Sequence, residues 1–211
     1  WQWEIRKVIE HNQNQIRFDS TLWHPSKPDF AYFLEDKLDF VTQHKEWYYD
    51  RNNNLLYIQW DELDIDKADI GAVIHDTGIL IDKGVTNVVV KDLAIQKFNQ
   101  SAITLTENAT DITISNNDIS NIEVFGIIMN RHCRNCIVND NTISDVLGRG
   151  ISMLEPQHCE ITGNRIIRTG MIAGHGFDGV NSGVAICMEN DETREASSES
   201  IAKHNRIAHN R

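Results

Sequence analysis

Thiol and imidazole groups form the first set of residues that could do chemistry. Cys133 and Cys136 form a Cys-x-x-Cys motif, and His158 and Cys159 follow later in the chain. Cysteine and histidine can bind zinc, and two cysteines can form a disulfide. A third alternative is that the thiols are core residues, since unpaired cysteine is among the most buried residue types. The elements that position these residues decide between the three.

Carboxylates form the second set. Glu155, Asp178 and Glu189 fall in one region, and His175 lies beside them in the sequence. Two carboxylates about 5–9 Å apart can hydrolyse a glycosidic bond. We therefore predict a catalytic role for these four residues, provided that the fold brings them together.

Basic and amide side chains form the third set. A polysaccharide lyase needs a base to remove a proton, and an arginine or a cation to neutralise a uronate carboxylate. The residues that suit such a site or bind substrate are Asn130, Arg131, His132 and Arg149, again with His175.

The elements that carry these residues repeat about every 24 residues from residue 77 onward. One series of aliphatic residues, each after Gly or Ala, is Ile79, Ile103, Ile127 and Ile151. A second series, each two places before an Ile, is Asn117, Asn141, Asn164 and Asn205. Self-similarity at a fixed period is the signature of a repeat architecture.

Apolar residues alternate within each repeat, as in Ile112 and Ile114, which is the periodicity of a strand. Three short strands per repeat with turns between them predict one coil of a parallel β-helix, stacked on the next at about 4.8 Å. An asparagine at a fixed turn can adopt a left-handed backbone and bond to the asparagine of the next coil. A leucine-rich repeat and a calcium-binding β-roll are excluded, because neither sequence frame is present.

The repeat is interrupted twice. Gly150 and Gly183 lie 33 residues apart, and Asn164 and Asn205 lie 41 apart. The extra residues fall at 171–181 and 189–200, on either side of one strand, and insertions in a solenoid often mark its binding face. We predict about five coils over 71–211, after a β-rich flank at 1–70 with a hairpin near 46–59.

Composition limits the partners. The formal charge of the chain is −11, with 21 acids and 11 bases in residues 1–130. This argues against unspecific binding to nucleic acid or to an anionic membrane. No apolar run is long enough to span a membrane. The sequence stops within a coil, and we expect the natural protein to continue beyond Arg211.

The Gly-Ile strands, the Asn-x-Ile turns and the 24-residue period resemble the right-handed parallel β-helix of the pectate-lyase-like superfamily. The resemblance implies a bacterial protein that is secreted, periplasmic or on the cell surface. It implies a polysaccharide substrate, degraded by a glycoside hydrolase or a polysaccharide lyase. No cofactor is implied, except Ca²⁺ for a lyase. The alternative is a non-catalytic glycan-binding, adhesin or phage-tailspike module, because one fold hosts many functions.

In enzymes of this family the substrate lies along the outside of the strand stack that includes GIIMN and GISML. Asn130, Arg131 and His132 leave this face. Glu107, Arg131 and Glu155 are expected at the same place on successive coils, either as a salt-bridge stack or as part of a cleft. The same frame stacks Cys136 on Cys159 inside the core, which favours core thiols and leaves a disulfide or zinc as alternatives.

Overall fold

The computed structural model describes residues 5–22, 32–61, 64–68, 70–171, 183–190 and 202–211. It divides into two units, Glu4–Ile70 and a second unit that contains Gly71–Arg211. Among the described residues, no helix is long and apolar enough to cross a membrane.

The smaller unit consists of two separate antiparallel hairpins and two short 3₁₀ helices. Strands β1 (Val8–Asn12) and β2 (Gln15–Phe18) form the first hairpin. Strands β3 (Trp47–Asp50) and β4 (Leu55–Ile58) form the second, over the segment for which the sequence predicts one. The helices are η1 (Leu38–Phe40) and η2 (Ile65–Lys67).

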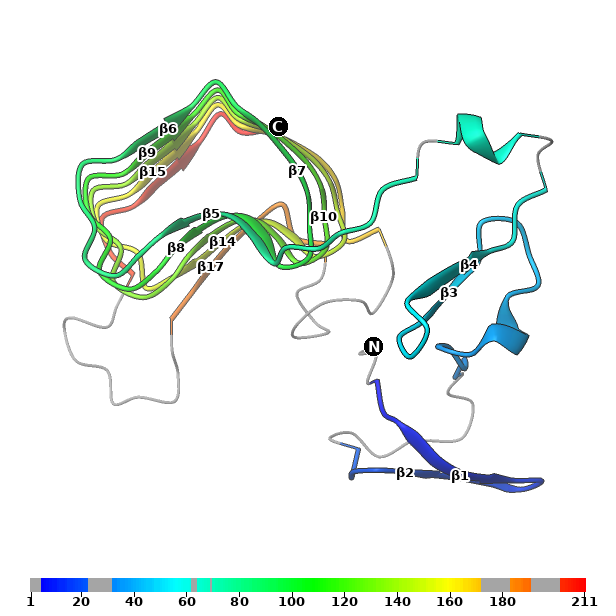
Figure 1. Cartoon of the computed structure of the whole chain (residues 1–211). Helices are drawn as coiled ribbons and strands as arrows, with labels where there is room; N and C mark the ends of the chain where they lie inside the picture. The colour runs from blue at the N-terminus through cyan, green and yellow to red at the C-terminus, as the bar shows by residue number, and fades with distance from the viewer. Residues whose placement is uncertain (1–4, 23–31, 62–63, 69, 172–182, 191–201) are drawn as a thin grey trace. The chain divides into compact units, whose positions relative to one another are not determined.

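The larger unit is a right-handed parallel β-solenoid (Figure 1). Each coil contributes one strand to each of three sheets. Sheet I contains β5 (Thr77–Ile81), β8 (Ser101–Leu105), β11 (Phe125–Met129), β14 (Arg149–Leu154) and β17 (Ile186–Glu189). Sheet II contains β6 (Val89–Lys91), β9 (Thr113–Ser115), β12 (Ile137–Asn139), β15 (Glu160–Thr162) and β18 (Arg206–Ala208). Sheet III contains β7 (Ala94–Phe98), β10 (Asp118–Ile122), β13 (Thr142–Val146) and β16 (Arg165–Thr169).

The predicted fold is confirmed, with four complete coils and a fifth of which two strands are described. The core is built from the residues that the alternation turns inward, because successive side chains of a strand face opposite sides. Ile127, Met129, Val138 and Ile143 are among the fully buried side chains of the third coil. In-register pairing stacks identical residues, as where Ile103, Ile127 and Ile151 form one column.

The corners of the coils depend on left-handed backbone conformations. Residues other than glycine with positive φ recur at four places per coil: Asn108, His132 and Glu155; Asn87, Asp111, Asn135, His158 and His204; Asp92, Asn116, Asp140 and His209; Lys97, Asn121, Asp145 and Arg168. Asparagine, aspartate and histidine are the side chains that tolerate this conformation best. Their frequency at the corners therefore follows from backbone geometry.

Two predicted registers are wrong in the last coil. Ile151 pairs with Ile186, so that Gly150 lies opposite Ala185 and not opposite Gly183. Asn164 bonds to Asn210, and Asn205 instead accepts a hydrogen bond from the backbone of Cys159. The sequence offers two asparagines five residues apart, and the one that fits the Asn-x-Ile pattern belongs to another corner.

Candidate functional site

Arg149 and Glu189 form an ion pair beside the last strands of sheet I. Ser152 lies between the core residues Ile151 and Met153 of β14, so it faces outward on the strand. Nη1 of Arg149 donates hydrogen bonds to Oγ of Ser152 at 3.1 Å and to Oε2 of Glu189 at 2.9 Å. Arg149 is only 5% exposed, whereas the Glu189 side chain is 33% exposed. The pair therefore places a half-accessible carboxylate on the outside of the solenoid.

Glu155 lies next to this pair. Its backbone N–H donates to the backbone oxygen of Glu189 at 2.8 Å, so the two predicted carboxylates are on adjacent coils at the same end of sheet I. The side chain of Glu155 is fully buried, and its Oε2 lies 3.6 Å from Nε2 of His132. A fully buried carboxylate is better placed to orient an imidazole than to touch a polysaccharide.

His132 is the more accessible member of this second pair, with 23% of its side chain exposed. Its Nδ1 is buried and has no hydrogen-bond partner among the residues that the structure describes. The residue has a φ of 62°, so its identity also suits the left-handed corner that it occupies. Chemical and backbone roles must therefore be separated by experiment.

The predicted column of Glu107, Arg131 and Glu155 is present only in part. Lys83 donates to Glu107 at 3.2 Å across adjacent coils. This hydrogen bond and the charges of Lys83, Arg131 and His132 lower the pKa of Glu107 below its ordinary value. Glu155 instead has the left-handed conformation of His132 on the coil before it. Because Arg134 pairs with Gln157, this coil is one residue shorter at the corner.

The remaining predicted site residues are placed as follows. Asn130 and Arg131 are half-buried and follow β11 directly, at the end of sheet I where Glu155 follows β14. His175 and Asp178 lie outside the described residues. Arg149, predicted to bind substrate, is held by Ser152 and Glu189 behind the accessible surface. The structure therefore brings together Glu155, Glu189, His132 and Arg149.

Sequence reasoning missed Ser152 and missed the pairing of Arg149 with Glu189. Ser152 takes the place of Thr104 and Ile128 in an outward column, which the 24-residue period could have shown. The ion pair could not be found that way, because 40 residues separate its members and the insertion hides their register.

The cysteines are core thiols, which confirms the favoured alternative. Cys133, Cys136 and Cys159 are buried, and all four cysteines are free. Burial raises the pKa of the Cys133 thiol to about 12. A hydrogen bond with Cys159, together with burial, raises the pKa of Cys136. Among the described residues, no group of three His, Cys, Asp or Glu is arranged to hold a metal ion.

Comparison with known proteins supports the architecture. A model of the family described as a right-handed β-helix region matches residues 51–211. Searches against curated proteins and against solved structures gave no match. The matched segment covers most of the chain and includes every strand of the solenoid. The chain therefore belongs to the right-handed β-helix family.

Proposed function

We propose that this chain is a carbohydrate-active β-helix protein that degrades a polysaccharide, either as a glycoside hydrolase or as a polysaccharide lyase. The observation that carries the proposal is the cluster of Glu155, Glu189 and His132 at the end of sheet I. Burying a carboxylate or an arginine is costly unless the charge is paired, so such clusters are kept for a reason.

The cluster offers groups for proton transfer. Glu189 is half-accessible and is held in one orientation by Arg149. His132 is partly exposed and backed by Glu155. Proton transfer by a positioned carboxylate or imidazole is the chemistry of both glycoside hydrolysis and β-elimination. A non-catalytic glycan-binding module would not need these paired charges.

The test is a product assay on a panel of polysaccharides. New reducing ends report any chain cleavage, and ultraviolet absorbance of unsaturated uronate ends reports elimination alone. We expect cleavage of at least one polymer by the intact chain. Reducing ends without the absorbance identify a hydrolase, and both signals together identify a lyase.

Two variants separate chemistry from backbone geometry. His132→Asn keeps a residue that tolerates the left-handed corner but removes the imidazole. His158→Asn is the matched control, because His158 also has a left-handed backbone and is exposed on the next coil. We expect a loss of about 100-fold in rate for His132→Asn, the size of a proton-transfer contribution, and little change for His158→Asn. Equal rates in both variants, or no product from any polymer, would reject the proposal.

A further inference from the structure

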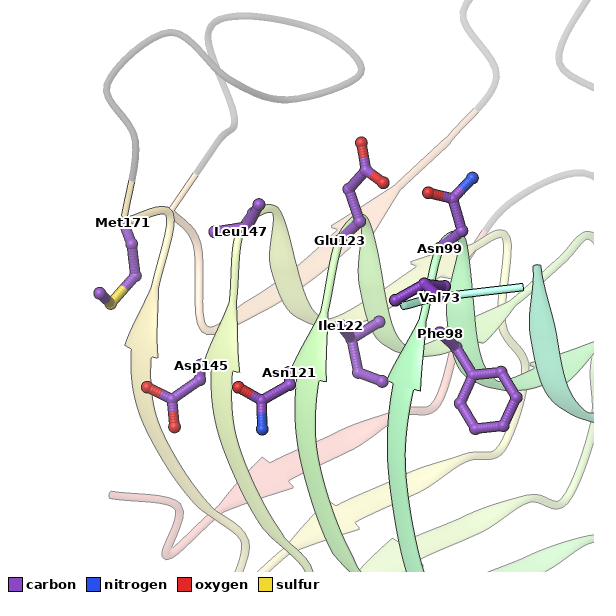
Figure 2. Close-up of a pocket in the computed structure, with 9 residues that line it drawn as sticks. All are labelled: Val73, Phe98, Asn99, Asn121, Ile122, Glu123, Asp145, Leu147 and Met171. Carbon is purple, nitrogen blue, oxygen red and sulfur yellow. The ribbon is translucent and has the colours of Figure 1, made fainter. Parts of the chain in front are cut away.

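A groove away from the outer face of sheet I runs along the corner that follows sheet III (Figure 2). Its volume is about 430 Å³, within the range of pockets that bind small ligands. The lining residues come from the ends of β7, β10 and β13 and the turns after them, with Val73 and Met171 at the two ends. The groove therefore extends across several coils, along the axis of the solenoid.

Polar side chains repeat along the groove. Asn121 and Asp145 occupy equivalent positions on neighbouring strands, because Ile122 pairs with Val146. Both have a left-handed backbone, and Figure 2 shows their side chains next to each other and pointing the same way. Asn99 and Glu123 form a second row on the other side of the strand ends. A hydrogen-bonding group is thus presented at each coil, about every 4.8 Å.

Apolar side chains lie between these polar rows. Phe98, Ile122, Leu147 and Met171 all contribute to the lining. Pyranose rings have apolar faces of C–H groups and a rim of hydroxyls, so they match a groove with an aliphatic floor and amide or carboxylate edges. One sugar in an extended glycan advances by a distance close to the coil spacing. Successive sugars can therefore meet equivalent side chains on successive coils.

The charges in the groove select among glycans. Glu123 and Asp145 are acidic, and none of the lining residues identified in the described part of the chain is Lys or Arg. Arg168 donates two hydrogen bonds of 2.6 Å to Asp145, which keeps that carboxylate ionised and fixes its orientation. Negative groups repel the carboxylates of a uronate polymer, in agreement with the formal charge of −11.

We propose that this groove binds an uncharged stretch of polysaccharide lying along the solenoid axis. The inference rests on the proposed function for its choice of glycan as ligand. It also fixes the reaction as hydrolysis, because β-elimination requires a uronate carboxylate next to the carbon that loses its proton.

The experiment is affinity electrophoresis of the full chain in gels that contain mannan, xylan, glucan or polygalacturonate. We expect at least one neutral polymer to retard the protein and polygalacturonate to leave it unaffected. Asn121→Gly should bind the neutral polymer about five- to tenfold more weakly, the effect of one or two lost hydrogen bonds. The change keeps the left-handed corner, which glycine adopts without strain.

Asn116→Gly is the matched control. Asn116 lies on the same coil, is also exposed and has a φ of 54°, against 55° for Asn121, but it is at a different corner. Its variant should bind as the unmodified chain does. Retardation by polygalacturonate, no retardation by any neutral polymer, or equal losses in both variants would overturn the groove. Binding that depends on Asn121 without any product would reject degradation alone, whereas product without such binding would reject the groove alone.

Discussion

The side-chain amide of Asn141 donates a hydrogen bond to the side-chain oxygen of Asn164 on the next coil, at 2.9 Å. The backbone N–H of Asn141 donates to the same oxygen at 3.0 Å. The same two bonds join Asn117 to Asn141 and Asn164 to Asn210. Each asparagine of this ladder also donates to a backbone carbonyl of the preceding coil. The ladder therefore satisfies the backbone of a buried corner that has no water.

Replacing Asn141 with alanine should lower the free energy of unfolding by about 3 kcal/mol, because buried donors and acceptors on both neighbouring coils lose their partners. Chemical denaturation measures this change. The control is Asn139→Ala, whose side chain bonds only to the exposed Asp140 among the contacts described, and whose effect should stay below about 0.5 kcal/mol. Equal effects for the two substitutions would show that the ladder adds little stability.

The ion pair of Arg149 and Glu189 should stabilise the last coil. Glu189→Gln leaves the charge of a buried arginine without its carboxylate, at a cost of about 2–4 kcal/mol. The exposed pair of Glu160 and Arg206 joins β15 to β18 and provides the comparison. Glu160→Gln should cost less than about 1 kcal/mol, as surface pairs do. Thermal unfolding of both variants distinguishes the two environments, and equal shifts in Tm would contradict the prediction.

The pair of Asp145 and Arg168 should make stability depend on pH. The hydrogen bond from Arg168 lowers the pKa of Asp145 below its ordinary 3.8. Its stabilising contribution is therefore fully present above that value, and is lost as pH falls through the lowered pKa of the folded state. Asp145→Asn should destabilise the protein at neutral pH and progressively less below about pH 4. In an Arg168→Gln background the same substitution should show little of this pH dependence, and persistence there would refute the assignment.

The buried thiols should resist modification in the folded protein. Cys133, with a pKa near 12, and the buried Cys136 and Cys159 present almost no thiolate at neutral pH. Cys187 is half-exposed and should react first with a maleimide. We expect one fast-reacting thiol in the native protein, none in the Cys187→Ser variant and four after denaturation. Recovery of only two thiols after denaturation without a reductant would instead indicate a disulfide.

The solenoid could be predicted because its determinants are local and repeated. Isoleucine columns and corner asparagines recur at 24 residues, and each coil makes the same demands on its sequence. The prediction lost register after Thr169, where local pattern no longer fixes which residue meets which. Asn205 and Asn210 both suit a corner, and only the pairing of Ile161 with Ile207 distinguishes them.

The candidate site was predictable as a set of residues but not as a geometry. Periodicity placed Glu155 and Glu189 on adjacent coils, as they are. It did not show that Arg149 is buried, that Glu155 is inaccessible or that His132 shares the corner of Glu155. These properties depend on the one-residue shortening between Arg134 and Gln157 and on packing around the last coil.

In-register pairing of β14 with β17 has a consequence for engineering. Ile151 and Ile186 are neighbours although their separation in sequence is longer than the 24 residues of a regular coil. The strands therefore set the position of each coil, and the length of chain between them is a free variable. Because closing a longer loop costs little extra entropy, segments of foreign sequence can be inserted at this junction without redesigning the core. The solenoid thus behaves as a modular frame, on which new binding loops can be displayed.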